Sequence, residues 1–269
     1  MNLLIDIGNT NLHWACRDIA GLGPMAAVRH GQGVPLDLLA AWEALPAPRR
    51  VLIGNVGGAL VGQAVERVVR AYWGCAAEFV ATRRDCLGLR VAYAEPARLG
   101  VDRWLALLAA HRADADAGAD AGAGSDAAGA LILDIGTAAT FDVLAPAGRH
   151  LGGLILPGLT MMRDSLLAGT HIPTGEPEPT ALPWATDTGA AVASGSRHAL
   201  AALAERLHQQ LWDLVSAAPG AHPAAPPALL LTGGDAPLIA PLIGRPLALI
   251  PDLVLRGLAC LAALPRAPV

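Results

Sequence analysis

Two segments of the sequence place an acidic side chain where an apolar run meets a glycine turn. Asp6 follows the apolar residues 3–5, Asp134 follows 131–133, and an Ile-Gly pair comes next in both segments. A glycine turn exposes backbone N–H groups and permits the close backbone approach that a phosphate group requires. One Asp-x-Gly turn is a common local structure. Two copies with matching flanks indicate an internal duplication, with a cleft between the halves for a nucleoside triphosphate and its metal.

Two further segments are candidates for a site. Gly-Val-Asp-Arg at 100–103 places an Asp-Arg pair at the start of a predicted helix. Taken alone, the pair is a helix N-terminal acid that the helix dipole favours, followed by a solvated arginine. Thr-Gly-Gly-Asp at 232–235 follows another apolar strand, and its glycines would let a flat ring such as adenine approach the backbone. Taken alone, that segment is an ordinary strand-to-helix turn.

Composition narrows the chemistry that these segments can perform. The chain is 54% hydrophobic and 16% charged, which is typical of a folded globular protein. Its 19 basic residues are all arginines, so a P-loop lysine, a Schiff-base lysine and a lysine general base are excluded. A net charge of −4, scattered arginines and few Phe or Tyr argue against a nucleic-acid surface. We therefore expect a small-molecule partner.

Cysteine spacing and the termini favour a soluble cytoplasmic protein. No Cys-x-x-Cys pair occurs, so neither a zinc site nor a disulfide scaffold is indicated, and we expect buried thiols at Cys16, Cys75, Cys86 and Cys260. The N-terminus lacks a basic region and reaches Asp6 at once, unlike a signal peptide. The apolar stretch 247–264 is interrupted by Pro251, Asp252 and Arg256, which argues against a membrane span.

Strands and helices alternate along the chain, which predicts an α/β fold. Helices are expected at 36–42, 60–72, 104–111, 159–167 and 188–214, and strands at 51–56, 78–80, 131–133, 141–144, 151–156 and 229–231. Residues 114–129 are Ala, Asp, Gly and one Ser, which bury little, so we predict a flexible connector. It would separate an N-terminal half, 1–113, from a C-terminal half, 130–269.

The predicted helix at 188–214 is strongly amphipathic, and Asp187 and Thr188 can cap its start. Its leucines recur at spacings of three and four, at Leu200, Leu203, Leu207, Leu211 and Leu214. In a single amphipathic helix such a row usually packs entirely into the intrachain core. This row is long enough to leave an apolar flank for a partner chain.

Five motifs, taken in order, resemble type III pantothenate kinases. They are Asp-Ile-Gly-Asn-Thr at 6–10, Gly-Val-Asp-Arg at 100–103, Asp-Ile-Gly-Thr-Ala at 134–138, Gly-Gly-Leu-Ile-Leu-Pro-Gly at 152–158 and Thr-Gly-Gly-Asp at 232–235. The resemblance spans nearly the whole chain. It implies two duplicated ribonuclease-H-like halves that close on ATP, as in actin, hexokinase and the heat-shock chaperones. Gly-x-Asp-Arg between two Asp-x-Gly hairpins distinguishes this kinase family within that superfamily.

The resemblance implies ATP-dependent phosphorylation of pantothenate to 4′-phosphopantothenate, the first step of coenzyme A biosynthesis, by a homodimer. Asp102 is implied as the base for the substrate hydroxyl, and Asp134 as the site of a monovalent cation, K⁺ or NH₄⁺. ATP, which would bind with Mg²⁺, is implied at Asp6, Ile7, Gly8, Asn9, Thr10, Asn11, Leu12, His13 and Thr137. Asp6 and Asp134 are the expected metal-side carboxylates. Pantothenate is implied at Tyr93, Gly100, Val101, Asp102, Arg103 and Thr188.

The sequence departs from the family pattern at two positions. His13 stands where relatives often carry a lysine, and Asp187 stands where they usually carry an asparagine. Two other interpretations remain. In the first, the chain is another enzyme of the same fold, either a different small-molecule kinase or a polyphosphate phosphatase. In the second, it is a nucleotide-binding regulatory protein without turnover. Asp102 separates these interpretations, because a regulatory protein needs no acid on the substrate side of the cleft.

Overall fold

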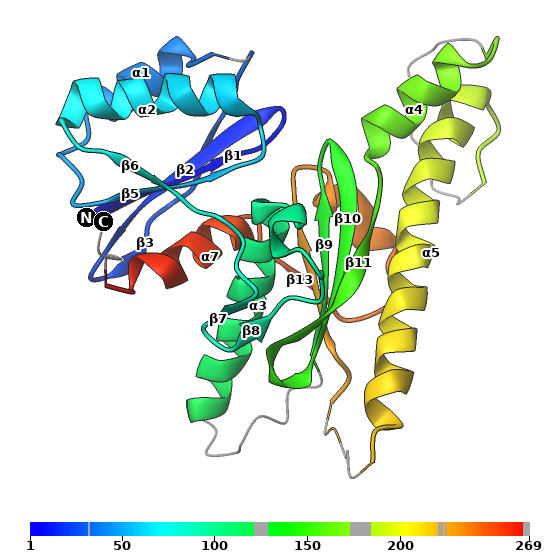
Figure 1. The fold of residues 1–269 in the computed structure, drawn as a ribbon. Helices are drawn as coiled ribbons and strands as arrows, with labels where there is room; N and C mark the ends of the chain where they lie inside the picture. Colours follow the sequence, from blue (N-terminus) through cyan, green and yellow to red (C-terminus); the bar gives the residue numbers. More distant parts are fainter. Residues whose placement is uncertain (32, 121–128, 173–183, 220–222, 224, 266–269) are drawn as a thin grey trace. The chain divides into compact units, whose positions relative to one another are not determined.

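The computed structural model describes residues 1–31, 33–120, 129–172, 184–219, 223 and 225–265. The chain divides by its contacts into two compact units, Met1–Ala113 with Asp252–Val269, and Asp114–Pro251. Each unit holds a mixed sheet with helices packed on it (Figure 1), which confirms the predicted α/β fold with duplicated halves. Within the described ranges, no helix has both the length and the apolar character that a membrane span requires.

The first unit contains a sheet with the strand order β3-β2-β1-β5-β6, and β4 also pairs with β2. β1 and β2 are antiparallel, whereas β5 and β6 run parallel to β1. The strands are β1 (Asn2–Ile7), β2 (Asn11–Asp18), β3 (Gly21–Leu22), β4 (Ala26–Arg29), β5 (Val51–Asn55) and β6 (Ala77–Phe79). The helices are α1 (Leu36–Glu43), α2 (Ala59–Trp73), α3 (Val101–Asp120) and α7 (Leu253–Ala262), with a short hairpin β7 (Asp85–Cys86) and β8 (Leu89–Arg90) and a 3₁₀ turn at Pro96–Arg98.

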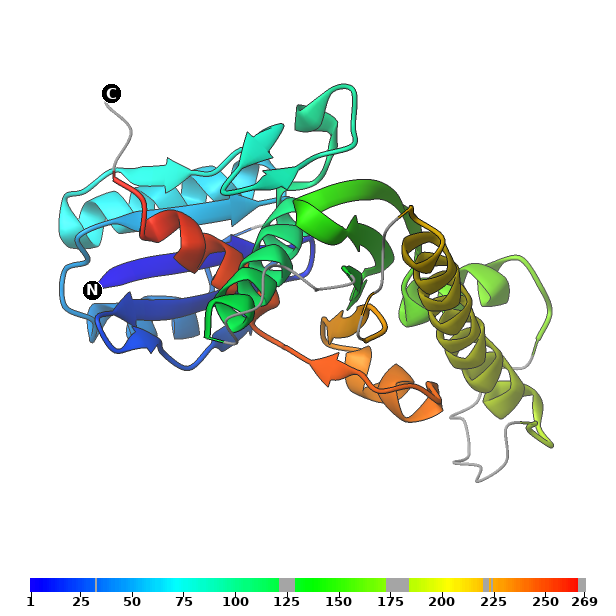
Figure 2. The same ribbon diagram turned by 90° about the horizontal axis from the view of Figure 1, so that it is seen from below.

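The residues of β1 alternate between two covered faces of the first sheet. Leu3, Ile5 and Ile7 form a core with side chains of α1 and α2, including Trp42 and Val65. α7 packs against β1, β2 and β5 (Figures 1 and 2). Because strand side chains alternate, Asp6 points to the face opposite α1 and α2.

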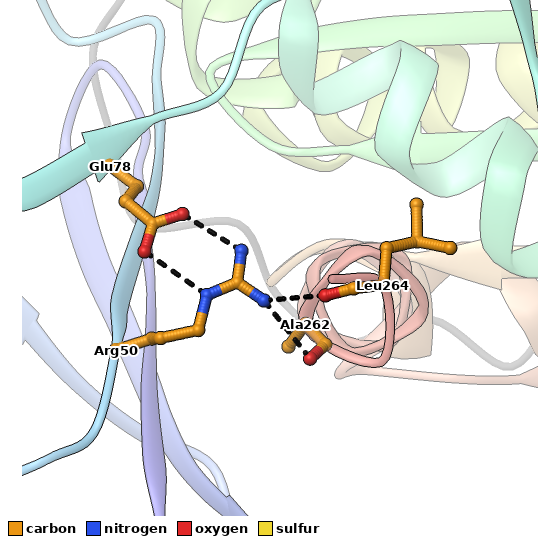
Figure 3. A network of polar contacts seen from close by, with 4 residues as sticks. All are labelled: Arg50, Glu78, Ala262 and Leu264. Atoms are coloured by element: carbon orange, nitrogen blue, oxygen red, sulfur yellow. Dashed lines mark hydrogen bonds and ion pairs between the residues drawn. The ribbon is translucent and has the colours of Figure 1, made fainter. Parts of the chain in front are cut away.

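Arg50 ties the end of α7 to the first sheet (Figure 3). Its guanidinium donates to both carboxylate oxygens of Glu78 at 3.0 and 2.8 Å, and to the carbonyl oxygens of Ala262 and Leu264 at 3.2 and 2.9 Å. The Glu78 hydrogen bonds raise the pKa of Arg50 above its ordinary value. Arg50 therefore binds carbonyl groups at the end of α7 that have no partners within the helix. The C-terminal residues 252–269 belong to the first unit, whereas the sequence prediction placed them in the second half.

The second unit repeats this arrangement with the strand order β13-β12-β9-β10-β11. β9 and β10 are antiparallel, and β12 and β13 run parallel to β9. Its elements are β9 (Ala130–Ile135), β10 (Ala138–Ala145), β11 (Arg149–Pro157), α4 (Leu159–Ala168), α5 (Thr188–Ser216), β12 (Ala228–Thr232), α6 (Ala236–Ile239) and β13 (Ala248–Leu249), with 3₁₀ turns at Pro146–Gly148 and Ala240–Leu242. Alternate residues of β9 and β10, such as Leu133 and Phe141, pack with Leu200 of α5.

Two sequence predictions differ from the structure in detail. α3 begins at Val101 and continues to Asp120, so the first part of the predicted connector is helical, which agrees with the high helix propensity of its alanines. Residues 121–128 lie outside the described residues. All four cysteines are half-buried rather than buried, because Cys16 and Cys75, for example, lie at the margin of the first core. The predicted cap of α5 is confirmed, since Asp187 accepts a hydrogen bond from the Ala190 N–H at 2.9 Å.

Candidate active site

The β1–β2 hairpin carries the whole predicted phosphate segment, residues 6–13. Ile7 pairs with Leu12 and Asp6 with His13 across the hairpin. The turn between them closes with a hydrogen bond from the Gly8 N–H to the Asn11 carbonyl oxygen at 2.9 Å. The end of β1 therefore presents a carboxylate on a strand and a polar turn directly after it.

Asp6 is 9% exposed, and its two carboxylate oxygens have different surroundings. Oδ2 lies 3.6 Å from Nδ1 of His13, whereas Oδ1 is buried and has no hydrogen-bond partner among the described residues. A buried carboxylate oxygen without a partner costs free energy. Such an oxygen is suited to a bound cation.

A magnesium ion bound together with a nucleotide needs few protein ligands. Among the described residues, no group of three or more His, Cys, Asp or Glu side chains could hold a metal ion. Mg²⁺ in phosphate-transfer sites is usually bound by one or two carboxylates, by substrate phosphates and by water. A single carboxylate such as Asp6 is therefore a sufficient protein contribution.

Gly54 of β5 lies between Asp6 and the start of α3. A Cβ atom at Gly54 would lie 2.9 Å from Leu105, 3.9 Å from Asp6 Oδ1 and 4.0 Å from Val101. The glycine therefore allows the first turn of α3 to approach the carboxylate of Asp6. The sequence prediction missed this residue.

The first turn of α3 holds four of the predicted substrate residues together. Asp102 accepts a hydrogen bond from the Arg103 N–H at 2.8 Å, and Arg103 donates from Nη1 to the Tyr93 hydroxyl at 3.3 Å. A Cβ atom at Gly100 would lie 2.5 Å from Asp102 Oδ1, so a side chain at this position would displace the Asp102 carboxylate. Arg103 is only 6% exposed, which excludes the interpretation of Arg103 as a solvated side chain.

The second hairpin, β9–β10, is tightly packed around Thr137. The Gly136 N–H donates to the Ala138 carbonyl oxygen at 2.9 Å, and the Gly158 N–H donates to the Thr137 carbonyl oxygen at 3.0 Å. A Cβ atom at Gly158 would lie 2.0 Å from the Gly136 carbonyl oxygen, so only glycine fits there. Thr137 itself is exposed at the tip of the turn.

Asp134 and the Thr-Gly-Gly-Asp segment are neighbours in the second unit. Thr232 pairs with Asp134, and the Asp235 N–H donates to the Ile135 carbonyl oxygen at 2.9 Å. A Cβ atom at Gly233 would lie 2.4 Å from Asp134 Oδ1, so this glycine makes room for the carboxylate. Burial raises the pKa of Asp235 above its ordinary value, and the positive charge of Arg197 opposes that shift.

The predicted site residues therefore fall in both units. The first unit contains the hairpin residues 6–13, Tyr93 and residues 100–103, whereas the second contains Asp134, Thr137 and Thr188. Thr188 opens α5 as an exposed residue.

A family model described as type III pantothenate kinase matches residues 2–210. The chain belongs to the type III pantothenate kinase family. A type III pantothenate kinase of Nitrosococcus oceani is 39% identical over 267 residues, which cover 97% of this chain and 94% of that protein. One of Paracidovorax citrulli is 36% identical, with 97% of each chain covered.

A solved structure of a Baf family protein from Campylobacter jejuni matches this member of the family in fold. It is 18% identical, covers 95% of this chain and 94% of that chain, and superposes with a TM-score of 0.50. At this level of identity the similarity shows the shared fold alone.

Sequence reasoning also missed the residues that support the first turn. The N–H groups of Val56 and Gly57 both donate to the Ile7 carbonyl oxygen, at 2.9 and 3.0 Å, and a Cβ atom at Gly57 would lie 2.4 Å from the Gly8 carbonyl oxygen. Asn-Val-Gly-Gly at 55–58 could have been found as the first-half counterpart of Thr-Gly-Gly-Asp. His30, which also contacts this turn, carries no motif that would reveal it.

Proposed function

We propose that this chain transfers the γ-phosphoryl group of ATP to the primary hydroxyl of pantothenate. The product is 4′-phosphopantothenate, an intermediate on the way to coenzyme A. Membership of the family supports this activity. The observation that carries the proposal is the cluster of Asp102, Arg103 and Tyr93 in the same unit as Asp6, with Gly54 joining the two segments.

Asp102 would orient the pantothenate hydroxyl and accept its proton. Phosphoryl transfer proceeds through a loose transition state, so catalysis depends mainly on position and on charge stabilisation. The hydrogen bond from the Arg103 N–H fixes the Asp102 carboxylate, and the Tyr93 contact fixes the buried Arg103 guanidinium. Tyr93, residues 100–103 and Thr188 would contact pantothenate.

The first hairpin would bind the phosphates of ATP, with Thr137 contacting ATP from the second. Mg²⁺ bound at Asp6 would neutralise charge on the phosphate oxygens. We further propose that Asp134 holds a monovalent cation, potassium or ammonium. The absence of lysine from the chain supports that assignment, because no ammonium side chain can neutralise the triphosphate.

A homodimer is the state we propose in solution. Large apolar side chains are exposed on two contacting elements of the second unit, Leu154 and Ile155 on β11 and Met161 and Leu166 on α4. Exposed apolar side chains that gather on one region of a soluble protein usually mark a partner surface.

Light scattering of Met161→Glu should give a lower mass than the wild type, whereas Leu60→Glu on the exposed face of α2 should not. Wild-type protein with a mass near one 27.4 kDa chain and full activity would overturn the dimer.

Product analysis tests the activity directly. The purified chain is incubated with MgATP and potassium, with and without pantothenate, and the products are identified by mass spectrometry. We expect ADP and phosphopantothenate to form in equal amounts, and only when pantothenate is present. Phosphate release without pantothenate would instead indicate a phosphatase. Transfer to acetate or to a sugar would indicate another kinase of the same fold, and the absence of turnover would indicate a regulatory protein.

A further inference from the structure

We infer that His30 is a positioning residue that fixes the first phosphate-binding turn for ATP. This inference rests on the proposed role of the turn between β1 and β2. His30 follows β4 and is 7% exposed. Its Nε2 lies 2.8 Å from the Gly8 carbonyl oxygen, and its backbone N–H donates to the Thr10 carbonyl oxygen at 3.1 Å. One residue thus binds two carbonyl groups of the same turn.

The contact with Gly8 fixes the protonation pattern of the imidazole. A carbonyl oxygen only accepts hydrogen bonds, so Nε2 must carry a hydrogen and donate it. Nδ1 is buried and has no hydrogen-bond partner among the described residues. Hydrogen on Nε2 alone suits this environment, because it leaves no buried N–H group without an acceptor.

The two bonded carbonyl groups determine where the N–H groups of the turn point. In a trans peptide the carbonyl group and the following N–H point in opposite directions, and the described residues contain no cis peptide bond. When the carbonyl groups of Gly8 and Thr10 face His30, the N–H groups of Asn9 and Asn11 face away from it. N–H groups held in one direction form an anion-binding concavity. His30 would therefore aim the donors of the turn at the phosphates.

The second half shows what replaces this histidine when the turn is shorter. Gly158 directly follows β11, just as His30 directly follows β4. The Gly158 N–H donates to the Thr137 carbonyl oxygen, and the His30 N–H donates in the same way to the Thr10 carbonyl oxygen. The second turn has one residue fewer between its flanking pairs, and it leaves no space for a side chain at Gly158. The longer first turn admits an imidazole at the equivalent position, so the side-chain contact is a feature of the first half.

His208 provides a matched control within the same chain. It is 3% exposed, its Nε2 lies 2.7 Å from the Pro227 carbonyl oxygen, and its Nδ1 is buried without a partner among the described residues. His208 belongs to α5 and touches neither turn in the contacts above. If buried histidines of this kind act only on stability, substitutions at His30 and His208 should have the same consequences.

The experiment compares leucine, glutamine and asparagine at both histidines. Glutamine places an N–H donor near the position of Nε2, asparagine falls one carbon short, and leucine has no donor. We expect His30→Leu and His30→Asn to raise KM for ATP about tenfold, a typical effect of losing one well-placed hydrogen bond. KM for pantothenate should stay within about twofold. His30→Gln should restore the KM for ATP, and all three His208 variants should leave it unchanged.

Three results would overturn the inference: an unchanged KM for ATP in both His30→Leu and His30→Asn, equal changes in both substrate KM values, or equal effects at His208. If His30→Leu does not fold, the KM for ATP of His30→Gln compared with that of His30→Asn tests the inference alone. Failure of this inference leaves the pantothenate-dependent turnover of the wild type intact, so it differs from failure of the proposed function. If wild-type turnover is absent, ADP binding measured calorimetrically for the same variants tests His30 separately.

Discussion

The turn between β1 and β2 and the turn between β9 and β10 occupy equivalent places in the two sheets, but they are held differently. The first is longer by one residue and is bound by a histidine side chain, by Val56 and by Gly57. The second is bound through the backbone of Gly158 and Asp235, with no space for a side chain at Gly158. A duplicated fold can thus keep its backbone hydrogen bonds while one copy acquires new side-chain contacts.

The carboxylates near the ends of β1 and β9, Asp6 and Asp134, also differ in their surroundings. Asp6 is buried and leaves Oδ1 without a partner among the described residues, whereas Asp134 is half-buried and packs against Gly233. An unsatisfied buried oxygen is expected where a ligand completes the site. This difference supports the proposal that Asp6 holds the divalent cation of the nucleotide and that Asp134 holds a different ion.

Substitution of Asp6 should give the largest effect in this comparison. Asp6→Asn keeps the shape but removes the charge, and we expect kcat to fall about 10²–10³-fold, the usual loss when one charge-stabilising group is removed. Thermal unfolding should not occur at a lower temperature, because the change removes the negative charge from a carboxylate whose buried Oδ1 has no hydrogen-bond partner among the described residues. Steady-state kinetics at several Mg²⁺ concentrations measures the first result. Wild-type kinetics at all Mg²⁺ concentrations would contradict the assignment.

Substitution of Asp134 should remove a dependence on potassium. We expect wild-type activity in sodium buffer to be at least about tenfold below that in potassium, because an ion held at Asp134 neutralises phosphate charge. In Asp134→Asn the two buffers should give equal, low rates. Assays at constant Mg²⁺ and ionic strength measure the ratio. Equal rates for the wild type in both buffers would remove the reason to place an ion at Asp134.

Much of this arrangement could be predicted from the sequence, because apolar runs, glycine turns and caps are local signals. The Asp-Ile-Gly repeat indicated the duplication, and Asp187 marked the start of α5. Neither His30 nor Gly54 could be found this way, since their roles depend on strand pairing between distant segments. α7 was missed because its residues are apolar on nearly all sides, which obscures helical periodicity.

The tightness of the second turn can be tested at Gly158. In Gly158→Ala the new methyl group would meet the Gly136 carbonyl oxygen, and we expect the free energy of unfolding to fall by about 1–3 kcal/mol. Gly195→Ala on α5 is the control, because a Cβ atom there meets nothing within 4 Å and alanine favours a helix. Urea denaturation of both variants gives the difference. Equal stability would show that the second turn tolerates a side chain.

The Arg50 contacts should have the smallest effect of the four. Arg50→Met removes the hydrogen bonds to Glu78 and to the end of α7, and we expect a loss of about 1–2 kcal/mol in unfolding free energy. Arg70→Met, which removes an exposed pair with Glu66 on α2, should change stability by less than about 0.5 kcal/mol. Denaturant titration compares them. An equal loss in both would mean that the anchor of α7 contributes no more than a surface pair.

If the first unit carries out phosphoryl transfer through Asp102, single-turnover transfer from γ-labelled ATP to pantothenate should depend on this carboxylate. For Asp102→Asn we predict a transfer rate lower by about 10²–10⁴-fold, as for loss of a positioned base, with ATP binding and folding retained. Asp187→Asn, a carboxylate-to-amide change that keeps a good helix cap in the second unit, should transfer phosphate at close to the wild-type rate. Near wild-type transfer by Asp102→Asn would rule out Asp102 as the base.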